Sequence, residues 1–264
     1  MKKKGDDNIP KRDNLSIKID YISIIFDSIT AEEVISKILE LPVDIFMKRP
    51  AKVKHKAYQS IYQAGSIKVY GDEKTEEKGS KKHGCYLVLS GRGCDEIYRI
   101  MNMRGSTFGN FFWLCEKRCG VDNFHLTRLD VAIDDRNEIP YFTPEQIKRK
   151  CEREEFVANS NSYRFVESSY TEKETAKTVY IGVGKSGMSY RFYDKDKEIC
   201  MKHQKSYEAV GSWKRTEIQL RDEKAHAFAM LFKKHPLDLG QLAFDLLGSN
   251  LRFVKEDKNQ SNKS

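Results

Sequence analysis

The chain has 264 residues, enough for one large domain or two small ones with a real core. Its residues are 39% hydrophobic and 33% charged, and no apolar run approaches the roughly 20 residues that span a bilayer, so no membrane helix is expected. The net charge of +8 favours polyanionic partners, chiefly nucleic acid. Because the start lacks an apolar secretory segment, a cytoplasmic protein is the expectation.

The first half of the chain alternates between predicted strands and helices. Residues 1–15 are predicted to form a disordered basic arm. The predicted strands are β-branched or alternate in polarity, and they cover 17–27, 58–70, 84–90 and 125–135. The predicted helices have apolar residues at helical spacing, and they cover 30–41, 93–103, 107–120 and 143–154. Thr30 and Thr143 are the expected N-caps of two of these helices.

The second half contains predicted strands at 162–170, 178–184, 188–195 and 213–222, and predicted helices at 223–234 and 237–248. This order predicts an α+β fold, an antiparallel sheet with helices on one face. The halves 16–155 and 156–254 look loosely alike, so an internal duplication is a further hypothesis. Residues 255–264 are predicted to be a disordered tail, which leaves 16–254 as the functional domain.

The strand LTRLDVAIDD carries charge on one of its two faces. Strand alternation places Thr127, Leu129, Val131 and Ile133 on a core face and Arg128, Asp130, Ala132 and Asp134 on a polar face. A solvated sheet face is the plain interpretation. Aspartate is a poor strand former, however, and like charges on one face repel. Asp130 and Asp134 are therefore candidate ligands of Mg²⁺ or Mn²⁺, which prefer oxygen donors.

Two later strands present similar polar faces. RTEIQLR places Arg215, Glu217, Gln219 and Arg221 on one side, and SYRFYDK places Arg191, Tyr193 and Lys195 on one side. A phenol can attack phosphorus, but its ordinary pKa near 10 keeps it protonated at neutral pH. A nearby cation would lower that pKa. The three strands together thus offer a metal site, phosphate-binding cations and a nucleophile.

Two other kinds of site are not supported. The glycine segment GVGKSG lacks the spacing of a nucleotide-binding loop, so a tight turn is predicted there, although Lys185 within it could contact a DNA phosphate. The six cysteines are irregularly spaced without a CxxC pair, and buried reduced thiols are favoured over a zinc site.

The ordered set of motifs resembles the replication initiation factor family, which includes rolling-circle plasmid initiators and related relaxases of integrative conjugative elements. The motifs are IDYISIIFD, HGCYLVLSGRGC, RLDVAIDD, YIGVGKSGMSYRFYDKDKE, RTEIQLR and LRFV, spread over residues 16–254. The resemblance implies a nicking enzyme whose tyrosine, here Tyr193, becomes linked to a 5′ phosphate. It also implies that Asp130 and Glu217, with Asp134 as a third, bind the divalent cation.

The expected function is therefore a metal-dependent, site-specific DNA strand transferase acting on single-stranded or cruciform origin DNA. Arg191 and Lys195 would assist Tyr193, and the cations expected at DNA phosphates are Arg128, Arg215, Arg221 and Lys185. A helicase and a second copy of the chain are further candidate partners. The alternatives are a sequence-specific DNA-binding module without nicking activity and an RNA-binding or structural protein. Tyr180 and Tyr190 stay open as alternative nucleophiles.

Overall fold

The computed structural model describes residues 14–51, 58–73, 84–160, 162–169, 175–182 and 187–254, apart from the side chains of residues 72 and 73. The predicted tail lies outside these residues, as does the predicted arm except for Asn14 and Leu15, and Leu15 already belongs to a strand. Among the described helices, none has both the length and the apolar character that crossing a membrane requires.

The chain divides into two compact units. The first unit comprises Met1–Ile17, Ala132–Ile218 and Asp245–Ser264, and the second comprises Lys18–Val131 and Gln219–Phe244. This division does not follow the expected boundary near residue 155, because the strands at 124–135 and 214–221 contribute residues to both units. The loose similarity of the two sequence halves stays a prediction.

The second unit is built on a sheet with strand order β2-β3-β4-β5-β1-β6. The strands are β1 Leu15–Phe26, β2 Met47–Pro50, β3 Tyr58–Ala64, β4 Ile67–Glu73, β5 Cys85–Leu89 and β6 Phe124–Asp135. The pairs β2–β3, β3–β4, β4–β5 and β5–β1 are all antiparallel. The apolar Ile22, Ile24 and Phe26 alternate along β1 and are fully buried, so their face of this sheet forms the core.

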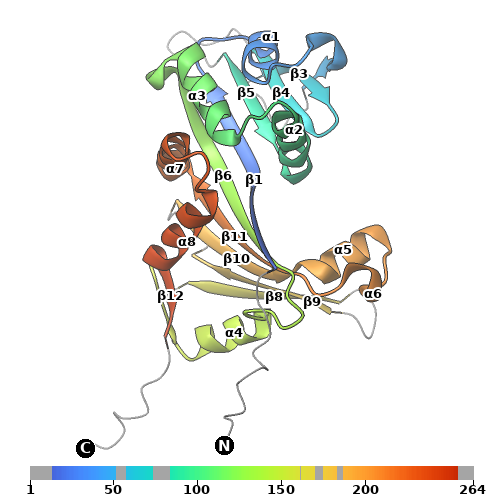
Figure 1. Ribbon diagram of the computed structural model, residues 1–264, viewed down its shortest axis with the longest axis vertical. Coiled ribbons are helices and arrows are strands. Elements are labelled where there is room, and N and C mark those ends of the chain that lie inside the picture. Colours follow the sequence, from blue (N-terminus) through green and yellow to red (C-terminus); the bar gives the residue numbers. More distant parts are fainter. Residues whose placement is uncertain are drawn as a thin grey trace, which may run out of the picture. The chain divides into compact units, whose positions relative to one another are not determined.

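Helices pack on that apolar face, as Figure 1 shows for α1 and α2. The helical elements of the second unit are α1 Ala31–Glu33, the π-helical turn η1 Val34–Ile38, η2 Val43–Ile45, α2 Gly91–Met103, α3 Phe108–Cys119, η4 Val121–Asn123 and α7 Asp222–Lys234. Capping boxes begin α1 at Thr30 and α3 at Thr107, because each threonine side chain accepts a hydrogen bond from a backbone N–H three residues later. Helix α8, Leu239–Asn250, begins in the second unit and ends in the first.

The first unit has the strand order β6-β11-β10-β9-β8. Its further strands are β8 Tyr163–Ser169, β9 Thr175–Ile181, β10 Met188–Asp194 and β11 Lys214–Arg221, with the separate pair β7 Phe156–Ala158 and β12 Leu251–Phe253. The helices are α4 Pro144–Glu152, α5 Lys195–His203 and α6 Tyr207–Val210. Phe192 of β10 meets the ring edges of Phe142 and Phe253, at centroid distances of 5.2 and 5.9 Å, and so joins the closing LRFV motif to the core.

The predicted α+β fold with a large antiparallel sheet is confirmed. Two local predictions are wrong. Residues 58–70 form two strands, because Gly65 adopts a φ of +54° and turns the chain between β3 and β4. Lys195 does not extend a strand but begins α5. The cysteines are as expected, since all six are free thiols and five are buried.

Strand β6 departs from strict alternation near its middle. The Thr127 hydroxyl lies 2.6 Å from that of Ser23, and the Arg128 guanidinium lies 4.3 Å from the ring centre of Tyr21. Tyr21 and Ser23 are two residues apart on β1 and share a face, so the adjacent Thr127 and Arg128 both point to that face. Two consecutive side chains on one side are typical of a β-bulge. The expected place of Thr127 on the core face is therefore wrong.

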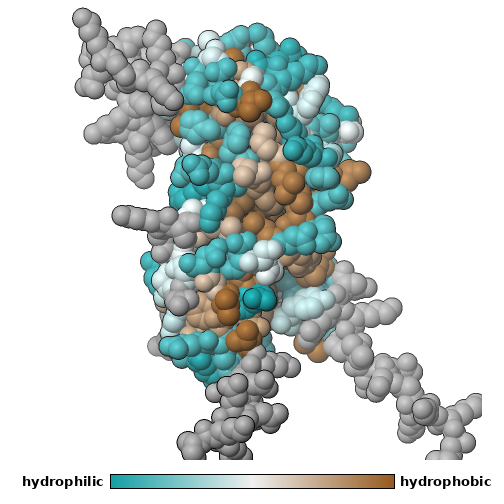
Figure 2. Space-filling model, turned by 90° about the vertical axis from the view of Figure 1, so that its left-hand side faces the viewer, coloured by the Kyte–Doolittle hydropathy of each residue, from teal (hydrophilic) through white to brown (hydrophobic). Residues whose placement is uncertain are grey.

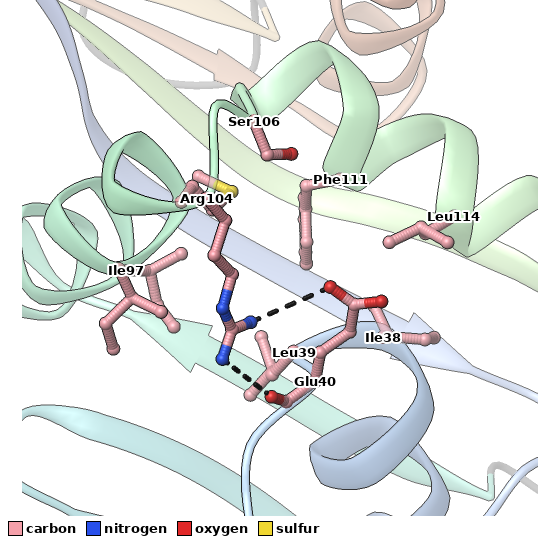
Figure 3. A pocket seen from close by; sticks show the side chains of 10 residues that line it. Ile38, Leu39, Glu40, Ile97, Arg104, Ser106, Phe111 and Leu114 are labelled. Atoms are coloured by element: carbon pink, nitrogen blue, oxygen red, sulfur yellow. Dashed lines mark hydrogen bonds and ion pairs between the residues drawn. The ribbon is translucent and has the colours of Figure 1, made fainter.

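An apolar hollow on the helical side of the second unit is closed by an ion pair. Figure 3 shows Arg104 reaching across it to Glu40, with an Nη1–Oε2 distance of 3.7 Å, while Nη2 donates to the Glu40 backbone carbonyl at 3.0 Å. The surrounding side chains are mostly aliphatic or aromatic, such as Ile97 and Phe111. The side chains around this hollow thus pack η1 against α2 and α3.

Apolar side chains also gather at the surface on the side of α7 and α8, the brown area of Figure 2. Among the residues of α7, α8 and the segment that joins them, Leu231, Leu237 and Phe244 are exposed, whereas Phe228 and Phe232 of α7 are buried. Helix α7 thus uses one stripe for the core and leaves apolar side chains on another.

Candidate functional site

The predicted nucleophile and one predicted metal ligand meet in the first unit. Tyr193 lies on β10 and Glu217 on the neighbouring β11, and the Tyr193 Oη donates a hydrogen bond of 2.6 Å to Glu217 Oε1. A phenol that already shares its proton with a carboxylate has an acceptor for that proton when it attacks. This contact brings together two residues that are 24 positions apart in the sequence.

Arg191 covers this pair from the surface side. Its guanidinium lies 3.9 Å from the ring centre of Tyr193, and its Nη1 lies 3.3 Å from Glu217 Oε2. The Tyr193 residue is only 2% exposed, while the Arg191 side chain is 35% exposed. The Arg191 Nε is buried and has no hydrogen-bond partner among the described residues. The group that covers the phenol is thus the partly exposed Arg191 guanidinium, whose Nε can still donate a hydrogen bond, and not an apolar side chain.

The environment raises the pKa of the Tyr193 phenol well above its ordinary value. Burial is the largest cause, and the Glu217 carboxylate adds to it, while Arg215 and Arg191 act in the opposite direction. The neighbouring arginines lower this pKa as expected, but desolvation and the carboxylate outweigh them. The phenol is held protonated at neutral pH.

Arg215 belongs to the interior. Its Nε and Nη2 donate to the two carboxylate oxygens of Asp134 at 2.6 and 2.8 Å, and its Nη1 lies 3.8 Å from Glu217. The Trp213 indole donates to the same Asp134 at 2.5 Å. The Arg215 side chain is 4% exposed and engaged by Asp134, and its predicted contact with a DNA phosphate stays a prediction. The charge of Asp134 is balanced by this arginine.

Lys195 stays close to the phenol although it begins a helix. Its Nζ lies 5.6 Å from the Tyr193 ring centre and pairs with Glu198 at 2.8 Å. A second charge cluster lies beside it and was not predicted. Lys214 Nζ contacts Asp194 at 2.8 Å and the fully buried Asp196 at 2.9 Å.

The acidic residues at the junction of β10 and α5 could have signalled this cluster. Asp196 and Glu198 stand in the first turn of α5, and Lys202 and His203 stand in the last turn, which is the charge order that a helix dipole favours.

The other predicted site residues are described by their own contacts. Asp130 belongs to the second unit, where Arg128 donates to its two oxygens at 2.8 and 2.5 Å. Arg221 is exposed at the end of β11 and donates to Gln219. Lys185 lies outside the described residues.

The alternative tyrosines differ in surroundings. Tyr190 is buried, and its hydroxyl donates to the Met188 sulfur at 2.9 Å. Burial raises the pKa of Tyr190 to about 12. Tyr180 is only half-buried and lies between two guanidinium groups, with Arg164 at 4.7 Å and Arg191 at 5.9 Å from its ring centre. Tyr180 is thus the stronger of the two alternatives.

The three predicted metal ligands have side chains that are already paired with other groups, and in this arrangement they do not form a cation site. Asp130 and Asp134 each give both oxygens to an arginine, and Glu217 is shared by Tyr193 and Arg191. Within the part of the chain that the structure describes, no three acidic, histidine or cysteine side chains gather closely enough to hold a metal ion. The donor set therefore does not fit a bound cation without rearrangement.

Two family models match most of the chain. Residues 124–264, more than half of the sequence, match the model described as replication initiation factor. Residues 16–114 match the model described as the N-terminal domain of rolling-circle replication initiation proteins. The first match contains β10 and β11, and thus Tyr193 and Glu217.

One curated relative and one solved structure are similar over nearly the whole chain. The chain is 28% identical over 244 residues to the Bacillus subtilis (strain 168) protein named "Putative DNA relaxase NicK". The match covers 91% of this chain but 65% of that relative's length. A rolling-circle replication initiator protein from Geobacillus stearothermophilus has the same fold, with a TM-score of 0.74, 24% identity and coverage of 94% of this chain and 90% of that one.

Proposed function

Because the chain belongs to the replication initiation factor family, we propose that it nicks one strand of an origin DNA and becomes linked to the 5′ phosphate through Tyr193. The contact between the Tyr193 hydroxyl and the Glu217 carboxylate, at 2.6 Å, is the observation that carries this proposal. The direct test is incubation with oligonucleotides from the element's own origin, followed by mapping of the peptide–DNA linkage.

The proposed step is a phosphoryl transfer. The Tyr193 oxygen attacks phosphorus while its proton passes to Glu217 Oε1, so a phenolic O–P bond forms. The P–O3′ bond breaks, and the 3′ oxygen leaves and takes up a proton to become a free hydroxyl. The product is a tyrosyl 5′-phosphodiester with no net change in bonds to phosphorus. The reverse step would reseal the strand.

Arg191 and Lys195 are proposed to position the phosphate. The buried Nε of Arg191 is a donor without a partner among the described residues, and a phosphate oxygen would satisfy it. Movement of the Arg191 guanidinium from the Tyr193 ring to the DNA would uncover the phenol at the moment when substrate binds. Lys195, 5.6 Å from the same ring centre, would balance charge on the phosphate.

A divalent cation, Mg²⁺ or Mn²⁺, with Asp130, Glu217 and Asp134 as ligands is part of what the family resemblance implies, and this ligand set stays a proposal. No step above depends on it, because these carboxylates are engaged by arginines and by Tyr193. Titration of Mn²⁺ into the DNA-free protein, followed by paramagnetic broadening of nearby resonances, tests whether an ion displaces those partners.

The proposed partner is single-stranded or cruciform origin DNA, contacted by the exposed Arg221 and the half-buried Arg128. Lys185, a further candidate for a phosphate contact, lies outside the described residues. A helicase and a second copy of the chain stay predictions. The alternative function is a sequence-specific DNA-binding module without nicking activity. The 2% exposure and raised pKa of Tyr193 favour this alternative, because a covered and protonated phenol is a poor nucleophile.

Replacing Glu217 by glutamine tests whether this carboxylate accepts the phenol proton. Glutamine keeps the shape of the side chain but does not accept the phenol proton, so the nicking rate at neutral pH is expected to fall by about 10²- to 10⁴-fold. Because burial keeps the pKa of Tyr193 above the working pH, the residual rate is expected to rise about tenfold for each pH unit as the phenolate fraction grows. Nicking is measured on a labelled origin oligonucleotide from pH 7 upward.

The matched control is Glu167→Gln, which changes an exposed glutamate on β8 in the same unit. It should nick at the wild-type rate. A Glu217→Gln variant that nicks as fast as the wild type at neutral pH would remove Glu217 from the proton transfer.

A further inference from the structure

The sheet of the second unit has one face that its helices leave open. Alternate residues of β5 are buried at Cys85, Leu87 and Leu89 and only half-buried at Tyr86 and Val88. Helix α1 packs on the buried side of the sheet. The packing is close at Gly71 of β4, where an added Cβ would lie 2.8 Å from the Cβ of Ala31 in α1. The open face is therefore the one that carries Tyr86.

Tyrosines from several strands gather on this open face. Tyr70 of β4 and Tyr86 of β5 are directly opposite partners, with ring centres 5.9 Å apart. Tyr58 of β3 lies 6.2 Å from the Tyr86 ring and nearly parallel to it, at 11°. Ile25 of β1 is the partner of Tyr86 in the register, and Tyr21 stands four residues before it on the same face. Tyr58 and Tyr70 are buried, at 7% exposure each, so the rings that the face presents are those of the half-buried Tyr21 and Tyr86.

Cations lie among these rings. The Arg128 guanidinium stacks over Tyr21 at 4.3 Å because the bulge in β6 turns it to this side. Lys68 lies opposite Val88 and Gln63, in the row next to Tyr70 and Tyr86. Arg49 of β2 donates to Gln63 at 2.6 Å. Rings for stacking, with cations between them, are the combination that single-stranded nucleic acids bind.

We propose that this open face, made of the half-buried Tyr21, Tyr86, Arg128 and Lys68, is a stacking platform for the single-stranded DNA of the origin. The proposal rests on the proposed function for the identity of the nucleic acid. The net charge of +8 and the basic side chains of the face complement a phosphate backbone. Bases would stack on the half-exposed ring of Tyr86, while Lys68 and Arg128 contact phosphates.

The test measures the affinity of the full chain for a short fluorescein-labelled oligothymidylate by fluorescence anisotropy. Tyr86→Leu keeps an apolar side chain but removes the ring, so Kd is expected to rise roughly tenfold, the loss of one stacked base. Tyr86→Phe keeps the ring and should bind within about twofold of the wild type. The control Tyr98→Leu removes a tyrosine that is 55% exposed on α2, away from the sheet face, and should bind like the wild type.

Lys68→Gln supplies a second readout. Loss of one phosphate contact is expected to lower the slope of log Kd against log salt by about 0.7. An unchanged slope together with an unchanged Kd for Tyr86→Leu would overturn the platform. An equal loss of DNA affinity in Tyr98→Leu would also overturn the platform. So would a Tyr86→Leu variant that keeps its DNA affinity but loses self-association, because this face would then bind a second copy of the chain.

The binding assay needs no cleavage, so it separates this inference from the nicking proposal. It is repeated in a Tyr193→Phe background, where no strand is cut. If Tyr86→Leu weakens binding there although the wild type never nicks, the platform stands and the nicking function fails. If the wild type nicks but Tyr86→Leu binds DNA normally, only the platform fails.

Discussion

Replacing Tyr193 by phenylalanine is expected to abolish both the nick and the covalent protein–DNA adduct. Phenylalanine fills the same volume beside Arg191 but has no oxygen to attack phosphorus and no hydrogen bond to Glu217. Loss of a nucleophile typically lowers turnover by on the order of 10⁴-fold or more. The measurement is a denaturing gel of an origin oligonucleotide, read for both the cleaved strand and the protein-linked strand.

Two tyrosine controls make the result specific. Tyr190→Phe removes a buried hydroxyl that donates to Met188, and it should leave the adduct yield unchanged. Tyr180→Phe tests the half-buried tyrosine between Arg164 and Arg191. An adduct that persists in Tyr193→Phe and disappears in Tyr180→Phe would transfer the nucleophile to Tyr180. Persistence in all three variants would place the nucleophile on another residue, whereas a wild type that binds the oligonucleotide but forms neither nick nor adduct would leave the DNA-binding module as the function.

Replacing Arg215 by methionine is expected to lower the free energy of unfolding by about 3 to 5 kcal/mol. Arg215 and Asp134 are both nearly fully buried, and the arginine binds both oxygens of the carboxylate. Methionine keeps much of the volume but leaves Asp134 as an uncompensated buried charge. The measurement is urea unfolding followed by circular dichroism, analysed for a change in midpoint at constant slope.

Two variants separate lost pairing from lost packing. Arg221→Ala removes an exposed arginine of the same strand, and the free energy of unfolding should change by no more than about 0.5 kcal/mol. The double variant Arg215→Met, Asp134→Asn removes both charges and should recover most of the lost stability, because a neutral pair leaves no buried ion. A double variant as unstable as Arg215→Met would show that packing around Arg215, not its charge, carries the effect.

Much of the fold follows from local patterns. Alternation along β1, β5 and β10 predicted strands that the structure contains, and threonines at positions 30 and 143 predicted two helix starts where capping boxes occur. The same alternation placed Tyr193 and Arg191 on one face, and the Arg191 guanidinium indeed stacks on the Tyr193 ring. These features depend on neighbours in sequence, so periodicity is sufficient to find them.

Local sequence patterns gave wrong predictions where a turn, a bulge or a helix start interrupts the alternation of side chains along a strand. The turn at Gly65, the bulge at Thr127 and the start of α5 at Lys195 each shift which side chains share a face. Alternation presumes an unbroken strand, and a single inserted residue reverses every assignment beyond it. For this reason the open tyrosine face of the second unit was not predicted.

From its sequence alone this chain is determined to be a basic α+β protein with strands that carry acids, arginines and a tyrosine in a set order. Only the tertiary structure decided which of these charges pair with each other. It placed Glu217 against Tyr193, gave Asp134 to Arg215 and Asp130 to Arg128, and buried the phenol. The physical reason is that ion pairing and desolvation depend on distances between strands far apart in sequence, and side-chain periodicity within one strand contains no information on those distances.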